Sequence, residues 1–141
     1  MDAVYRLAPD GEWLYPNVKA IFGEVHPADP VSLEGARGLA EEVASLLPSL
    51  GEARIYAPLA VGHHIDHQIT RTAAQLLLEV GHKVVFYEDY PYAETPGVLE
   101  AALSLAGTDK WRMETVDLSP ENVAAKVSAL GYHRSQLAIL F

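Results

Sequence analysis

Apolar residues in this chain recur either at helical spacing or in short continuous runs. Helical spacing predicts four helices, near residues 32–50, 66–81, 95–107 and 119–131. Continuous apolar runs predict buried strands at 54–58 and 83–87 and a weaker strand at 111–117. Strands and helices that alternate in this way are joined by right-handed crossovers and form a mostly parallel sheet covered on both faces. The pattern therefore predicts the α/β class.

The ends and buried faces of these helices carry their own signals. Ser32 and Ser119 are expected to be N-caps, and Pro120 occupies the first-turn position that favours proline. Glycines are expected to end three of the helices, at Gly81, Gly107 and Gly131. The first helix should bury Leu39, Val43, Leu46, Leu47 and Leu50. The last helix should bury Val123, Val127 and Leu130.

The first 30 residues lack a regular hydrophobic pattern, because prolines and turn residues interrupt them throughout. Only residues 18–25 could form an extended segment. Three strands also make a thin sheet, since sheets usually have about five or six. The sequence therefore predicts one domain over residues 1–141, partial at its amino-terminal end, with residues 1–30 as an irregular lead-in.

Composition narrows the class of protein. Half of the 141 residues are hydrophobic, 21% are charged and the mean hydropathy is +0.07, as expected for a soluble globular protein. A formal net charge of −9 disfavours nucleic-acid binding, because an acidic surface repels phosphates. The absence of cysteine excludes disulfides and thiolate metal sites. No apolar run approaches a membrane span and no signal peptide is visible, so a cytoplasmic protein without a membrane partner is expected.

The densest polar cluster is Gly62-His63-His64-Ile65-Asp66-His67, which follows a predicted strand and opens a predicted helix. Ligands and catalytic groups of α/β proteins gather at such carboxyl ends of strands. The positive end of a helix dipole favours neutral imidazole, the form that binds a metal, so His67 is a candidate ligand. Asp66 could cap the helix or orient a histidine through Nδ1. The alternative is a polar loop of surface histidines with Asp66 as a simple cap.

Weaker candidates lie elsewhere in the chain. Glu88 and Asp89 follow a strand and could face the same crevice, or they could form a solvated acidic turn. Tyr87, Tyr90 and Tyr92 could stack on a sugar or pack at the rim of the core. His133 is expected to cap a helix end, with a pocket role second, and His26-Pro27-Ala28-Asp29 is expected to be a turn that only imitates a metal pair. Phosphate-binding glycine loops and a GxSxG elbow are absent from the sequence.

Three motifs in order resemble the PIG-L/LmbE-like family of N-deacetylases. The first two are Tyr56-Ala57-Pro58 with His64-Ile65-Asp66-His67, and residues 85–92, VFYEDYPY. The third, Lys126…Ala129-Leu130…His133-Arg134-Ser135-Gln136, matches the closing pattern of that family.

The resemblance implies a Rossmann-like, three-layer α/β/α fold and zinc-dependent hydrolysis of an N-acetyl group on a glucosamine-type sugar or related small amide. It assigns zinc binding to His67, oxyanion stabilisation to His64 and the orientation of His64 to Asp66. Substrate contacts are expected from Glu88, Asp89, Tyr92 and His133. The family's HPDD segment, which supplies two further zinc ligands and the base, is missing: residues 26–29 have Ala28 in place of the base. We therefore expect a partial zinc site and weak or no activity from this chain alone.

Two other interpretations remain open. The chain could be a non-catalytic scaffold of the same fold whose open sheet edge forms a homo-oligomer or accepts a partner chain. Alternatively, a metal site could be rebuilt locally or across a subunit interface from His63, His67 and Asp29 or Asp89.

Overall fold

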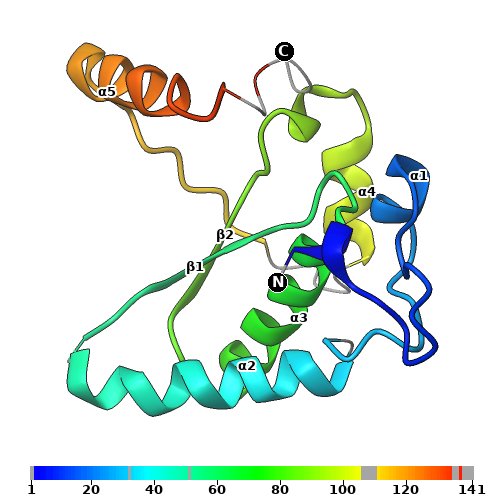
Figure 1. Cartoon of the computed structure of the whole chain (residues 1–141). Coiled ribbons are helices and arrows are strands. Elements are labelled where there is room, and N and C mark those ends of the chain that lie inside the picture. The colour runs from blue at the N-terminus through cyan, green and yellow to red at the C-terminus, as the bar shows by residue number, and fades with distance from the viewer. Residues whose placement is uncertain (1, 32, 51, 106–110, 135–136, 138–141) are drawn as a thin grey trace. The chain divides into compact units, whose positions relative to one another are not determined.

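A computed structural model describes residues 2–31, 33–50, 52–105, 111–134 and 137 of the chain (Figure 1). These residues fall into two compact units, 1–106 and 107–141, and each is described by itself. The expectation of a single domain over 1–141 stays a prediction. The helices and strands of the first unit are α1 (Val18–Ile21), α2 (Leu33–Leu46), β1 (Ile55–Pro58), α3 (Ile65–Glu79), β2 (Val84–Tyr87) and α4 (Val98–Leu105). The second unit contains α5 (Pro120–Leu130).

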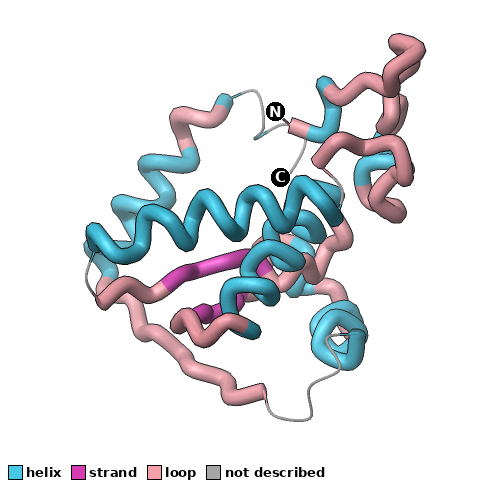
Figure 2. The backbone as a smooth tube through the Cα atoms, turned by 90° about the horizontal axis from the view of Figure 1, so that it is seen from below, coloured by secondary structure: helices cyan, strands magenta, loops and turns pink. Residues whose placement is uncertain are grey.

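The centre of the first unit is a parallel pair of strands, seen side by side in Figure 2. Their register runs from Ile55 opposite Val84 to Pro58 opposite Tyr87. The connecting helix α3 packs against both strands, as a crossover between parallel strands requires. The α/β class predicted from the sequence is therefore confirmed, and among the described residues the sheet has two strands.

The predicted strand at residues 111–117 is wrong, because the backbone there is irregular. Trp111, Met113 and Val116 are exposed, and no other described segment of the second unit is a strand. A strand needs a partner to take up its backbone hydrogen bonds, so apolar residues alone do not hold this segment in the extended form.

The core of the first unit lies where α2 packs against α3 (Figure 1). Ala36 and Ala40 of α2 are buried there, together with Ile69, Ala73 and Leu77 of α3. The expected stripe of leucines is therefore only partly right: Val43 packs on this core, but Leu39 and Leu46 are exposed. Small alanine side chains one helical turn apart give α2 a face that fits closely against α3, and this face excludes the leucines.

Residues 18–25 are not extended, because Val18–Ile21 form the single turn of α1. The side chain of Asn17 caps this turn by accepting a hydrogen bond from the Ala20 amide (3.0 Å). The lead-in is otherwise irregular, yet it contributes Ala3, Leu14 and Tyr15 to the core. The first 30 residues are thus an integral part of the first unit.

Helix ends follow the expected signals where the structure describes them. Gly81 adopts a φ of +96° just after α3, and the Ser119 hydroxyl accepts from the Asn122 amide at the start of α5. Ser32 and Gly107 lie outside the described residues. The buried stripe expected on α5 is wrong for the second unit, which leaves Val123, Val127 and Leu130 exposed. Among the described residues, no helix has the length and apolar character needed to cross a membrane.

Candidate functional site

The candidate site lies at the carboxyl ends of β1 and β2, where two loops are tied together. The Leu59 amide donates to the Tyr87 carbonyl (2.9 Å), which extends the strand pairing by one step. The Val61 amide then donates to Asp89 Oδ2 (3.0 Å), so a side chain replaces the next backbone partner. These bonds bring the histidine cluster and the 88–92 segment to one edge of the sheet, as the order of strands and helices predicted.

The loop that carries the histidines has an unusual backbone. Ala60 and His63 both have a φ of +60°, in the left-handed region that non-glycine residues rarely adopt. Between them, Gly62 lies against the ring of Tyr92, and a Cβ at position 62 would overlap that ring. The loop is therefore held in a strained turn that only packing and hydrogen bonds from other segments can maintain.

His64 forms the N-cap of α3, a position that the sequence had offered to Asp66. Its Nδ1 accepts a hydrogen bond from the Asp66 amide (3.2 Å). Burial, followed by the proximity of His67, lowers the pKa of His64. A neutral imidazole whose Nδ1 accepts carries its proton on Nε2, so His64 is set up as a hydrogen-bond donor.

His67 lies in the first turn of α3 and faces Asp89. Its Nδ1 is 2.7 Å from Asp89 Oδ1, and among the described residues neither of these two buried atoms makes a hydrogen bond of regular geometry. Burial alone raises the pKa of Asp89, but the His67 ring and the Val61 amide hold it below its usual value. Asp89 is therefore an ionised carboxylate enclosed beside an imidazole.

Aromatic rings enclose the two histidines. Phe22 packs edge-on against His64 at a centroid distance of 5.3 Å and against Tyr92 at 5.5 Å. Tyr92 lies 6.3 Å from His67 by the same measure, and burial together with nearby Asp89 raises the pKa of its hydroxyl. Sequence analysis missed Phe22, since a phenylalanine in a segment without periodicity carries no signal of its position.

The Asp66 carboxylate is engaged by the lead-in. It accepts from the Ala3 amide (3.0 Å) and from the Arg6 guanidinium, and Oδ2 lies 4.0 Å from His64 Nδ1. The atom that contacts His64 Nδ1 is thus the backbone amide of Asp66. The orienting role of the Asp66 carboxylate stays a prediction, and Arg6 joins the site as a partner that sequence analysis missed.

Asp29 is the buried centre of the same network. It accepts from Arg6 (2.8 Å), from the Tyr15 hydroxyl (2.8 Å) and from the Val31 amide (2.8 Å). Burial raises the pKa of Asp29, but these three donors together lower it below the usual value. These three hydrogen bonds use the Asp29 carboxylate to anchor the lead-in segment. The neighbouring His26 accepts from the Ala28 amide, in the turn that the sequence predicts.

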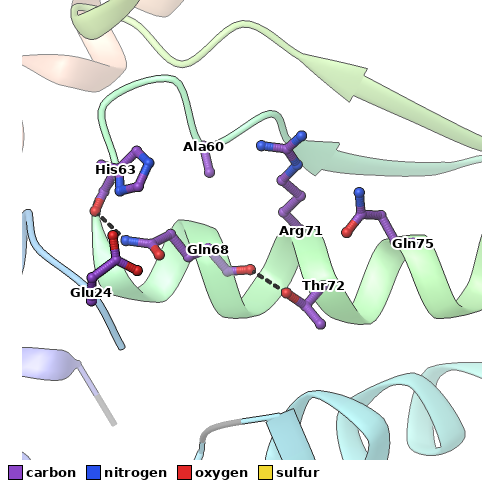
Figure 3. A pocket seen from close by; sticks show the side chains of 7 residues that line it. All are labelled: Glu24, Ala60, His63, Gln68, Arg71, Thr72 and Gln75. Atoms are coloured by element: carbon purple, nitrogen blue, oxygen red, sulfur yellow. Dashed lines mark hydrogen bonds between the residues drawn. The ribbon is translucent and has the colours of Figure 1, made fainter. Parts of the chain in front are cut away.

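A polar cavity of about 420 Å³ opens beside the histidine loop (Figure 3). Gln68 ties its wall together, because Nε2 donates both to the Gly23 carbonyl (2.7 Å) and to the His63 carbonyl (2.6 Å). The lining residues are Glu24, Ala60, His63, Gln68, Arg71, Thr72 and Gln75. Most of these side chains carry hydrogen-bonding groups, and Gln68, Arg71 and Thr72 already donate to backbone carbonyls.

The other residues that the sequence singles out lie outside this buried cluster. Glu88 is exposed at the end of β2, and Tyr87 and Tyr90 are also largely exposed. His133 belongs to the second unit, where its amide donates to the Leu130 carbonyl (2.9 Å) at the end of α5. Ser135 and Gln136 of the closing motif lie outside the described residues.

The described residues do not assemble a complete metal centre. They contain no group of three histidine or acidic side chains close enough to share an ion. A catalytic zinc site uses three protein ligands, so His67 and its neighbours do not fit zinc by themselves.

The fold and site define an α/β protein with paired histidines and a buried carboxylate at the carboxyl edge of a parallel sheet. No protein-family model matches the chain. A curated relative, the 2′-N-acetylparomamine deacetylase of Streptomyces fradiae, is 38% identical over 72 residues, which are 50% of this chain and 26% of that protein.

Solved deacetylases share the fold. The zinc-inhibited form of teicoplanin deacetylase matches with a TM-score of 0.70 and 26% identity over 99% of this chain and 53% of its own. A deacetylase–teicoplanin complex matches with a TM-score of 0.67 and 26% identity over 97% of this chain and 54% of its own. The resemblance to deacetylases that the three motifs indicate is therefore confirmed.

The chain spans about half the length of the solved relatives and matches about a quarter of the curated one. The proteins matched in both comparisons are deacetylases.

Proposed function

We propose that this protein takes part in removing an N-acetyl group from a glucosamine-type sugar or a related small amide. The observation that carries the proposal is the pair of histidines, His64 and His67, held beside Asp89 at the edge of the sheet. The relationship to deacetylases supports it. In the reaction, water adds to the amide carbonyl, the C–N bond breaks, and acetate and a free amine are released.

His64 is the residue proposed to stabilise the oxyanion. Its Nδ1 already accepts from a backbone amide, so the Nε2–H is free to donate to a carbonyl oxygen as that oxygen gains charge. The raised pKa of Tyr92 keeps its hydroxyl protonated, which makes it a second donor for a polar substrate. Asp66 is proposed to hold the start of α3 in place. Glu88 remains a proposed substrate-side residue, the substrate contact of His133 in the second unit stays a prediction, and Asp89 is buried beside His67.

Zinc is proposed as the metal of the complete site. A solved relative is described as zinc-inhibited, which supports a metal-binding family. His67 is the proposed ligand from this chain, and the other protein ligands would have to come from outside the described residues. Because the site is not complete here, no step of the reaction is assigned to the metal.

The polar cavity supports a hydroxyl-rich substrate. Gln68, Arg71, Thr72 and Gln75 line it from successive turns of α3, directly after His64 and His67 in the chain. An amino sugar carries hydroxyl groups that such side chains can bind.

Association with a second copy or a partner chain, in the cytoplasm, also remains a proposal. The described sheet has two strands, and each therefore has one edge without a strand beside it among the described residues. Open strand edges favour pairing with another chain. Light scattering at increasing dilution tests this, and a monomer at every concentration would contradict it.

The function is tested by incubating the chain with N-acetylglucosamine and measuring acetate release, with and without added zinc. We expect slow release that falls by on the order of 100-fold in His64→Ala, the cost of losing one oxyanion donor. His82→Ala, at the opposite end of α3, is the matched control and should retain the wild-type rate. The proposal is overturned if wild type releases no more acetate than His64→Ala does.

A further inference from the structure

Asp89 differs from the other carboxylates of the site in how tightly its position is fixed. Its side chain is 1% exposed, and each of its oxygens lies against a named group. Oδ2 accepts from the Val61 amide, and Oδ1 faces His67 Nδ1 at 2.7 Å. The Val61 amide belongs to the loop after β1 and Asp89 to the loop after β2, so the parallel pairing of the strands fixes this carboxylate.

The orientation of the His67 ring follows from this contact. Nδ1 is buried and lies 2.7 Å from Asp89 Oδ1, its acidic neighbour among the described residues, whereas 35% of the whole side chain is accessible. An ionised carboxylate can only accept hydrogen bonds, so a ring nitrogen that faces it must carry the proton. A neutral His67 with its proton on Nδ1 has its lone pair on Nε2.

We propose that Asp89 is a positioning residue that fixes His67 in the Nδ1–H tautomer and presents its unprotonated Nε2 to the site. An Nε2 lone pair is what a metal ion or a transferred proton requires. The sequence placed Asp89 on the substrate side and gave the orienting role to Asp66. The proposal moves that role to Asp89 and directs it at the other histidine.

The Asp66 carboxylate is not placed to orient His67. Its two oxygens accept from Ala3 and Arg6, and it lies on the part of α3 that faces the lead-in. Asp66 and Asp89 are thus two acidic residues near the same pair of histidines with separate tasks. Asp66 anchors the lead-in segment, and Asp89 sets the tautomer of His67.

Replacing Asp89 by asparagine gives a sharp test because the Val61 amide still needs an acceptor. The amide oxygen of asparagine should take that bond, which leaves its NH2 group facing His67 Nδ1. A donor at that position requires Nδ1 to accept. The proton of His67 should therefore move to Nε2 in Asp89→Asn.

The experiment is nitrogen-15 NMR of the histidine side chains at mildly alkaline pH, where neutral rings report their tautomer. We expect His67 to be protonated on Nδ1 in the wild type and on Nε2 in Asp89→Asn. Glu88→Gln is the matched control, since it alters the adjacent exposed carboxylate and should leave the tautomer unchanged.

A wild-type His67 protonated on Nε2 would overturn the proposal, and so would an unchanged tautomer in a folded Asp89→Asn. The wild-type spectrum alone decides the matter if that variant does not fold. The inference deepens the proposed function, but the two fail separately: the tautomer is measured without substrate, and acetate release is measured without reference to the tautomer.

Discussion

Gly62 lies directly against the ring of Tyr92, and this contact joins the histidine loop to the segment after β2. A Cβ at position 62 would overlap ring atoms, so Gly62→Ala must displace either the loop or the ring. We expect a loss of about 1–3 kcal/mol in the free energy of unfolding, as for overpacking elsewhere. Urea denaturation followed by near-ultraviolet circular dichroism measures it.

Gly38→Ala is the matched control for Gly62→Ala. Gly38 lies inside α2, and a Cβ there meets no atom within 4 Å. Alanine should stabilise the helix by about 0.5–1 kcal/mol. Equal effects of the two substitutions would show that Tyr92 does not pack on the loop in solution.

Arg6 bridges Asp29 and Asp66, and its removal should be costly. Arg6→Ala leaves two carboxylates, one of them fully buried, without their shared cation. We expect destabilisation of roughly 3–5 kcal/mol, the range found when one partner of a buried ion pair is deleted. Thermal and urea unfolding check this.

The exposed pair of Lys83 and Glu52, 3.7 Å apart, provides the comparison for Arg6. Lys83→Ala should change stability by less than about 1 kcal/mol, because solvent screens exposed charges. Similar losses in Arg6→Ala and Lys83→Ala would contradict a buried network.

Tyr15 should make the protein sensitive to alkaline pH. Burial, together with the hydrogen bond to Asp29, raises its pKa from 10.0 to about 12. The unfolded chain loses this proton near pH 10 while the folded chain retains it, so the free energy of unfolding falls as pH rises between these values. Tyr15→Phe should remove this part of the pH dependence.

Tyr15→Phe should also cost about 1–3 kcal/mol at neutral pH, because Asp29 and the His26 amide both lose a partner. Tyr5→Phe, at an exposed ring, should stay within about 0.5 kcal/mol. If the alkaline stability profiles of wild type and Tyr15→Phe run parallel, the Tyr15 hydroxyl is not buried as described.

Zinc should be held weakly by this chain alone. The described residues contain one imidazole oriented by a carboxylate and no three-donor group. We expect substoichiometric zinc after dialysis, measured by atomic absorption, and a further decrease in His67→Ala. Full retention of one zinc per chain would contradict this and would point to ligands outside the described residues.

Local features of the sequence were enough to predict much of the fold. The β1–α3–β2 unit was predicted because its apolar runs and its helical stripe are contained within each segment. The strand at 111–117 failed because a strand also requires a partner. The leucine stripe of α2 failed in part because the neighbouring helix decides which face is buried.

The location of the candidate site in the fold could be predicted from the sequence, but the side-chain contacts within the site could not. Residues 62–67 stood out because polar residues after a buried strand mark the carboxyl edge of a sheet. Phe22 and Arg6 did not stand out, since they come from an irregular segment whose path depends on long-range packing.

By itself, the sequence determined the α/β class, the parallel pairing that the alternating elements imply, and His64 and His67 as the centre of interest. Only the tertiary structure decided which partner each acidic residue contacts. The Asp66 carboxylate contacts Arg6, and the Asp89 carboxylate contacts His67. The reason is physical. Helical and strand periodicity are set by neighbours in the chain, whereas a contact between loops depends on strand register and on which buried groups need a partner.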